Sequence, residues 1–286
     1  ISGHADRLVP VNMYAPPDAS RDGLRLLFLA GSGYPEALNV LDLGPAPPPE
    51  ADLHLVLVEP SYGPSGAELA FIRRLPPEAV LLLVLMPDER LHDARRREVA
   101  ATAGVRADRV VVASTVADLQ PVLARRLVAR FKDQAVALAR QFPFLREEAV
   151  SQEVLATSQQ NAMVGVIPVP GADMPVMTLN QIKMVMRLAT MYDQPLAYDR
   201  LREVLAVVGG GFALRTAARQ VAKLLPGPGW LVAGGMGYAG TLAMGKAAAE
   251  FFRRTARPGP SGPAFGPDGR PVIDAQATVV DPTGPA

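Results

Sequence analysis

The stretch with the clearest chemical signature is RLLFLAGSGYPEALNVLDLG, residues 25–44. An apolar run, a turn at Gly31, Ser32 and Gly33 and then a short helix-like segment with Leu38, Leu41 and Leu43 have the outline of the strand, phosphate-binding loop and helix that open a nucleotide-binding domain. A P-loop also needs a Lys for the phosphate charge and a Ser or Thr for magnesium after its second glycine. Tyr34 and Pro35 follow Gly33 instead. We therefore expect a degenerate phosphate loop that binds no cofactor.

The composition offers little other chemistry. The chain of 286 residues has no cysteine and only three histidines, His4, His54 and His92, which lack the four-residue spacing of zinc helices. The 29 basic and 28 acidic residues give a net charge of +1, which creates no global field for a polyanion. We expect no metal site, no catalytic residues and no nucleic-acid partner.

Four apolar runs define the first half of the chain: 24–31, 53–59, 79–86 and 109–114. Continuous Val and Leu runs of this length are typical of strands buried on both faces, as in parallel sheets. Amphipathic segments separate them, one starting with a capping box at Ser65 and Glu68, one stopping at Gly104, and a long one over residues 114–142. The pattern predicts a doubly wound parallel α/β domain over residues 23–142, after a leader at 1–22.

The β signal disappears after Phe144. Helical patterns end near Pro168, restart with Asp173 as an N-cap and Pro175 in the first turn, and continue to Arg254. We expect an all-α domain over residues 146–254. The remaining 257–286 segment is rich in Pro and Gly, and we expect it to be disordered.

The first domain resembles the G domain of Era-like GTPases. Its ADLHLVLVEPSYGPSGAELAFIRRL, AVLLLVLMPDERL and DRVVVASTVADL segments are similar to the strand and helix after switch II, the strand before the guanine-reading motif, and the strand before the S-A-K motif. Met86, Pro87 and Glu89 stand where guanine-reading residues belong, and no switch segments fit between Gly33 and Leu53. The resemblance implies a G-like domain that has lost its nucleotide. A flavodoxin-like or receiver-like domain of other origin is the alternative.

The second domain resembles the YcjF-type bacterial domain of unknown function that follows Era-like GTPase domains. The likeness is carried by the I-P-x-P-G-x-D-x-P core at Ile167 to Pro175 and by the glycine-spaced last helix. It implies association with a membrane or a GTPase partner.

Several residues of the helical domain are candidates for partner or membrane contact. The methionine cluster that includes Met184 and Met191 could form an adaptable binding face, and filling the core is its alternative role. Small residues along the last helix would let another helix approach closely. Basic residues flank the apolar segments and could face lipid phosphates or simply water. The candidates are Met184, Met191, Arg215, Arg219, Lys223, Gly237 and Gly240.

These features favour a non-catalytic adaptor or scaffold that docks through its helical domain. Its partner would be a protein, either a GTPase or a second copy of this chain, or the cytoplasmic face of the cell membrane. The uncharged run Trp230 to Gly245 is shorter than the roughly 20 residues of a spanning helix, which favours peripheral attachment. Two alternatives stay open: a nucleotide-binding enzyme with an atypical phosphate loop, and an integral membrane component built of short helical hairpins.

Overall fold

The computed structural model describes residues 8–16, 18–44, 48–58, 63–166, 174–194 and 229–256. The chain divides into two compact units at Leu123/Ala124. We call Pro10–Leu123 the α/β unit and the described residues from Ala124 onward the helical unit. The division falls inside the helix Val116–Arg130, whereas the sequence pattern predicts a boundary after residue 142.

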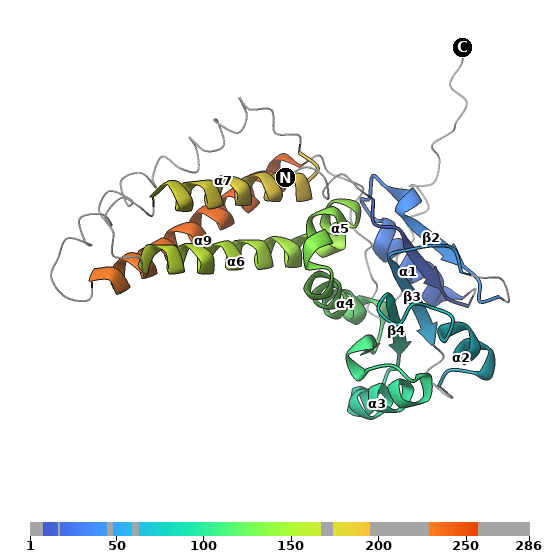
Figure 1. Ribbon diagram of the computed structural model, residues 1–286. Coiled ribbons are helices and arrows are strands. Elements are labelled where there is room, and N and C mark those ends of the chain that lie inside the picture. Colours follow the sequence, from blue (N-terminus) through green and yellow to red (C-terminus); the bar gives the residue numbers. More distant parts are fainter. Residues whose placement is uncertain are drawn as a thin grey trace, which may run out of the picture. The chain divides into compact units, whose positions relative to one another are not determined.

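The α/β unit contains a five-stranded sheet in the order β2-β1-β3-β4-β5, and every neighbouring pair is parallel (Figure 1). The expected doubly wound parallel sheet is confirmed, and its strand order is that of flavodoxin-like sheets. The strands are β1 (Val11–Tyr14), β2 (Leu38–Leu41), β3 (Leu53–Val58), β4 (Val80–Leu85) and β5 (Val110–Ala113), and the main helices are α1 (Ala19–Leu29), α2 (Gly66–Ile72) and α3 (His92–Ala103).

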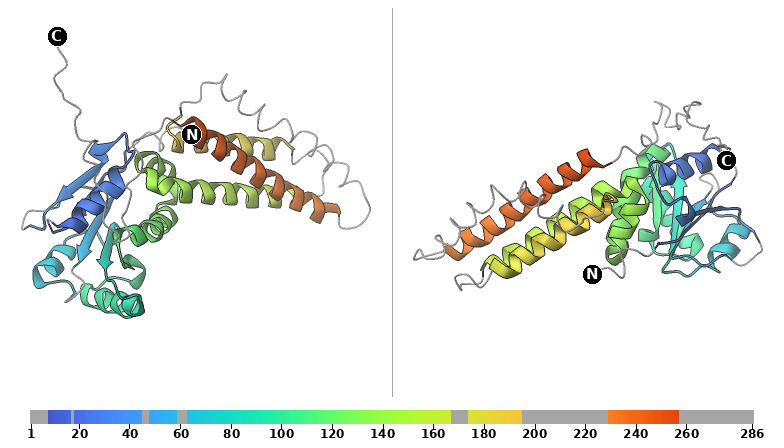
Figure 2. Two further views of the ribbon diagram at one scale, coloured as in Figure 1. Left: turned by 180° about the vertical axis from the view of Figure 1, so that it is seen from behind. Right: turned by 90° about the horizontal axis from the view of Figure 1, so that it is seen from above.

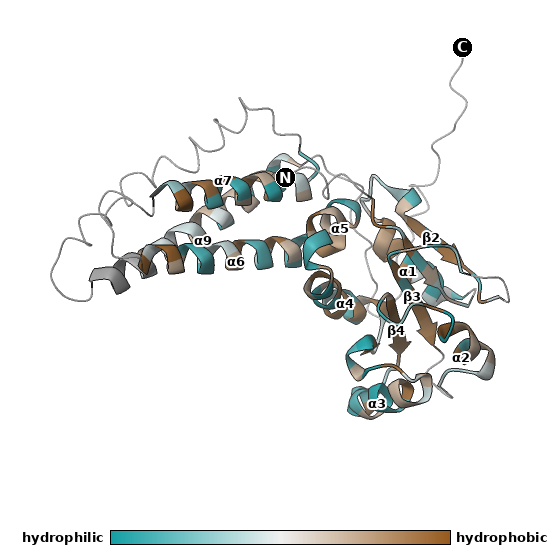
Figure 3. Ribbon diagram, in the orientation of Figure 1, coloured by the Kyte–Doolittle hydropathy of each residue, from teal (hydrophilic) through white to brown (hydrophobic). Residues whose placement is uncertain are grey.

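Apolar burial explains the central strands. All six residues of β3 are buried, and β4 and β5 continue the same pattern across the register. Figure 3 shows β3 and β4 as hydrophobic and α3 as largely hydrophilic, as expected of a surface helix beside a buried sheet. Caps fix the helix ends: Ser65 and Glu68 form the expected capping box of α2, and Gly104 ends α3 with φ 70°.

The prediction for the first forty residues was wrong. Residues 24–29 belong to α1, and the expected leader contains β1, while the segment after Gly33 forms β2 instead of a helix. The cause is local: Asp18 accepts hydrogen bonds from the Ser20 and Arg21 N–H groups and so starts a helix. Leu24, Leu27 and Phe28 then share one buried face at helical spacing.

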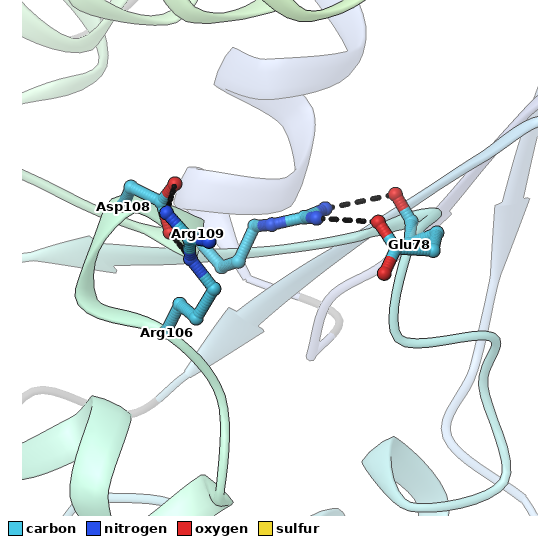
Figure 4. A network of polar contacts seen from close by, with 4 residues as sticks. All are labelled: Glu78, Arg106, Asp108 and Arg109. Carbon is cyan, nitrogen blue, oxygen red and sulfur yellow. Dashed lines mark hydrogen bonds and ion pairs between the residues drawn. The ribbon is translucent and has the colours of Figure 1, made fainter.

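A buried arginine links the starts of two strands. Arg109, just before β5, donates from Nη1 to the Glu78 carbonyl at 2.8 Å and from Nη2 to the Glu78 carboxylate at 2.9 Å (Figure 4). Arg106 and Asp108 form a separate exposed pair beside it. Ligands of doubly wound sheets bind at the opposite, carboxyl ends of the strands. We therefore interpret Arg109 as a structural clamp between the β4 and β5 connections.

The helical unit is built on three long helices that pack on one another (Figures 1 and 2). Hydrogen bonds pair Gln181 with Thr241 and Gln194 with Thr255, so the second and third of these helices are parallel. The first is antiparallel to both, because its start at Arg146 bonds to the Met191 carbonyl. They are α6 (Arg146–Val166), α7 (Met174–Met191) and α9 (Gly229–Thr255). The shorter α4 (Val116–Arg130) and α5 (Ala135–Gln141) precede them in the chain.

The long helix expected over residues 114–142 is two helices. The chain turns at Phe131, whose φ of −101° and ψ of 49° are not helical, and a short 3-10 turn precedes α5. The expected helices ending near Pro168, restarting before Pro175 and running to the C-terminal arginines are confirmed. Asp173, Gly209 to Gly211 and residues 257–286 lie outside the described residues.

A polar layer crosses the helical core. The fully buried Asn161 of α6 donates from Nδ2 to Thr241 Oγ1 of α9 at 3.0 Å and to the Met177 carbonyl of α7 at 3.4 Å. Its Oδ1 accepts from Asn180 at 2.9 Å, and Gln181 also donates to Thr241 Oγ1. Because an unpaired buried amide is costly, these bonds favour one register of the three helices over slipped alternatives.

Candidate binding groove on the helical unit

The predicted phosphate loop is not in a position to bind phosphate. Gly31, Ser32 and Gly33 follow the C-terminus of α1 and lead into β2, so the expected strand-to-helix turn is a helix-to-strand turn. Gly31 takes a φ of 68°, which a glycine adopts without strain. Backbone N–H groups of a phosphate loop point at the ligand from the start of a helix, and here the loop adjoins a helix end.

The N-terminus of α1 follows the first strand of the doubly wound sheet, and a carboxylate of the chain itself, that of Asp18, binds to it. Asp18 Oδ1 accepts hydrogen bonds from the Ser20 and Arg21 N–H groups at 3.0 and 3.1 Å. These are donors that a bound phosphate would use at a helix N-terminus. The Asp18 carboxylate occupies them and also places a negative charge against any approaching phosphate.

The helical unit contains a groove of about 750 Å³ along α6 and α7. Its wall combines amide and charged side chains from both helices with apolar surface, and the apolar part is the larger share of the exposed area. The polar side chains of such a wall can hydrogen-bond to a ligand, and its alanines leave space for that ligand in the groove. The lining residues used below are Lys132, Gln152, Glu153, Ala156, Gln159, Gln160, Asn180, Lys183 and Arg187.

Three cations and one carboxylate line this groove. Arg187 Nε lies 3.3 Å from Glu153 Oε2, and the Glu153 side chain is only 15% exposed. Burial raises the pKa of the Glu153 carboxyl, and the neighbouring guanidinium offsets part of that rise. Arg187 is 41% exposed and keeps further N–H donors beyond Nε. Lys132 and Lys183 are exposed and have no ion-pair partner within the described residues.

An apolar stripe on α7 borders the groove. Val176, Leu179 and Met186 are 46, 50 and 37% exposed, and they share one side of the helix with Lys183. Exposed large apolar side chains interleaved with cations differ from an ordinary solvated helix face, which carries mostly polar groups. The groove therefore adjoins a surface that can contact both apolar and anionic groups.

The structure describes four of the seven expected contact residues. Met184 and Met191 are 0 and 1% exposed, so they fill the core, which was the alternative role of the methionine cluster, and Met191 also reaches the groove lining. Gly237 is buried and Gly240 half-buried on α9. Met184 is therefore not available on the described surface, whereas Met191 borders the groove. Arg215, Arg219 and Lys223 lie outside the described residues.

The groove residues were missed by sequence reasoning. Lys183 and Arg187 stand four residues apart on an otherwise uncharged helix, a spacing that places both on one face. That spacing was the available signal, but the partner carboxylate Glu153 lies 34 positions before Arg187 in the sequence. Only packing of α6 against α7 brings the two together.

The two parts of the sequence on either side of the Leu123/Ala124 division carry opposite charge. Residues 10–123 contain 10 basic and 15 acidic residues, a formal charge of −5, whereas residues 124–256 contain 16 basic and nine acidic residues, a formal charge of +7. The balanced charge of the whole chain conceals this division. A basic unit raises the local concentration of acidic partners and speeds their association. Among the described helices, none is long and apolar enough to cross a membrane.

Comparison with known proteins identifies one region of the chain. No curated protein and no solved structure matches the chain. Residues 138–277, from α5 through α9 and beyond, match the family model described as "Domain of unknown function (DUF697)". The expectation of a domain of unknown function over the helical region is thereby confirmed.

Proposed function

We propose that this protein is a non-catalytic adaptor that docks onto a partner protein through the groove of its helical unit. The observation that carries the proposal is the groove itself, with two lysines that have no ion-pair partner among the described residues and the apolar stripe of α7 beside it. A concave surface suits a protruding segment of a protein, whereas a membrane surface needs no concavity.

The α/β unit, in this proposal, binds no nucleotide and serves as a rigid carrier. Asp18 supports this role, because its carboxylate holds the N–H groups at the start of α1. The strand order supports the flavodoxin-like alternative to a degenerate G domain. Peripheral attachment to the cytoplasmic membrane face then follows only if the docked partner is itself a membrane protein.

Site-specific photocrosslinking in native cells tests the proposal. A photoreactive residue at Gln160, which is exposed and lines the groove, should crosslink to one protein in high yield. The matched control is Ser151, which is exposed on the same helix and not part of the lining. Equal crosslinking from both positions, or none from Gln160, would contradict docking in the groove.

A further inference from the structure

We infer that the groove between α6 and α7 takes an acidic, partly apolar peptide segment of the partner; this inference rests on the proposed function above. It adds a chemical class of ligand to the docking surface, and it depends on the charges that the groove presents.

The first argument is the charge of the lining. Lys132, Lys183 and Arg187 face one carboxylate, Glu153, which is already engaged by Arg187. The wall therefore has an excess of two positive charges. The +7 formal charge of residues 124–256 has the same sign, so an acidic segment is attracted before it reaches the groove.

The second argument is the distribution of donors. Arg187 has five N–H donors, and its contact with Glu153 runs through Nε, which leaves the outer Nη groups for another acceptor. The Lys183 ammonium adds three donors four residues away on the same face of α7. Paired carboxylates spaced by one helical turn on a bound segment would match these two cations.

The third argument is the apolar stripe beside the cations. Leu179 and Met186 flank Lys183 and are half-exposed in the described structure. An amphipathic segment with carboxylates toward Lys183 and Arg187 would cover these side chains with its apolar positions. Methionine adapts its shape to different partners, which suits such a contact.

The inference is tested by displaying a library of random peptides, with no net charge on average, to the full chain. We expect the retained peptides to be enriched in Asp and Glu at least about threefold over the input, equivalent to ~0.7 kcal/mol per selected position. The double variant Lys132→Glu and Lys183→Glu should lose this enrichment and favour Lys and Arg. Lys246→Glu, an exposed charge reversal on α9 outside the lining, should keep the acidic selection.

Three results would overturn the inference. Retained peptides could be neutral or basic, the double variant could select the same acidic peptides as the unchanged chain, or no peptide could be retained at all.

A separate experiment measures binding of the full chain to vesicles of phosphatidylcholine with one-fifth phosphatidylglycerol. Vesicle binding that Lys183→Glu abolishes, without any peptide selection, would assign the groove to lipid headgroups instead.

The outcome also separates this inference from the proposed function. Selection of neutral peptides, together with crosslinking from Gln160, would leave docking in the groove intact and remove only the acidic class. Acidic selection without a crosslinked partner in cells would support the acidic class of ligand and contradict the proposed docking of a partner protein.

Discussion

Gly245 of α9 lies so close to Val154 of α6 that a Cβ built on the glycine would stand 2.6 Å from Cγ1 and 2.7 Å from Cγ2 of the valine. Val154 is buried and β-branched, so few rotamers are open to it and it cannot move away at low cost. The absence of a side chain at residue 245 therefore sets the distance between these two helices. This is the close helix approach that the small residues of α9 predicted.

Gly245→Ala should destabilise the helical unit. Alanine gains about 1 kcal/mol in helix propensity over glycine, but overpacking a filled core costs about 1–3 kcal/mol. At a contact of 2.6 Å we expect the overpacking cost to be larger. The free energy of unfolding, measured by chemical denaturation, should fall.

Gly235→Ala on the same helix is the matched control. A Cβ at residue 235 meets nothing within 4 Å, so only the propensity term applies and the protein should gain about 1 kcal/mol. Adding Val154→Ala to Gly245→Ala should recover part of the loss caused by the clash. If both glycine variants are stabilised alike, the helices adjust freely and the close contact is not restrictive.

Asn161→Ala should lower the free energy of unfolding by about 1–3 kcal/mol. The substitution removes the amide that joins Thr241, Met177 and Asn180, and it leaves their buried polar groups without those bonds. Gln160→Ala, one residue earlier and exposed, should change stability by less than about 0.5 kcal/mol. Alanine is a better helix former than either residue, so propensity cannot cause a loss. A loss of the same size in both variants would contradict a specific contribution of the polar layer.

His54 should make the stability of the α/β unit depend on pH. Its ring is 2% exposed and stacks on Tyr14, and burial lowers its pKa below the ordinary 6.5. Below pH 6.5 the unfolded chain binds a proton at His54 that the native protein does not bind. The free energy of unfolding should therefore fall as the pH drops below 6.5. His54→Leu should flatten this part of the profile. Parallel profiles for the two proteins between pH 7.5 and 5.5 would exclude His54 as the cause.

The α/β unit should not bind magnesium GTP or ATP at physiological concentrations. The Asp18 carboxylate holds the N–H groups of α1, and Gly31 to Gly33 follow a helix end. Calorimetric titration should find no dissociation constant below about 100 μM, or roughly −5.5 kcal/mol of binding. Tighter binding to either nucleotide would restore the alternative of an enzyme with an atypical phosphate loop.

The sequence predicted those parts of the fold where one signal dominates. Strands β3, β4 and β5, which are apolar except for His54, have no other stable environment than a sheet covered on both faces. Residues 24–29 were ambiguous because a short apolar run fits a buried strand and a buried helix face equally well. The deciding signal was the Asp18 cap.

Strands β1 and β2 were missed because each has only four residues and contains a polar one. Asn12 of β1 and Asn39 of β2 interrupt the apolar pattern, yet the Asn39 amide donates to Asn12 Oδ1 at 2.9 Å and satisfies it within the sheet. Such pairing depends on the parallel register, in which Asn12 faces both Asn39 and His54. No local pattern contains that information.

The groove could not be predicted for a related reason. Its lining combines Lys132 beside α5 with Glu153 of α6 and Arg187 of α7, which become neighbours only through helix packing. The methionine cluster, in contrast, left two roles open from the sequence, an adaptable binding face and core filling, and the burial of Met184 and Met191 agrees with core filling.

The affinity of the partner found by crosslinking tests the central claim most directly. Gln160→Trp fills the groove from α6, and Ser151→Trp places the same side chain on the same helix outside the lining. Docking in the groove predicts a dissociation constant at least about tenfold weaker for Gln160→Trp, or ~1.4 kcal/mol, and nearly unchanged for Ser151→Trp. Equal affinities for both variants and the unchanged chain would contradict the claim that the groove is the docking site.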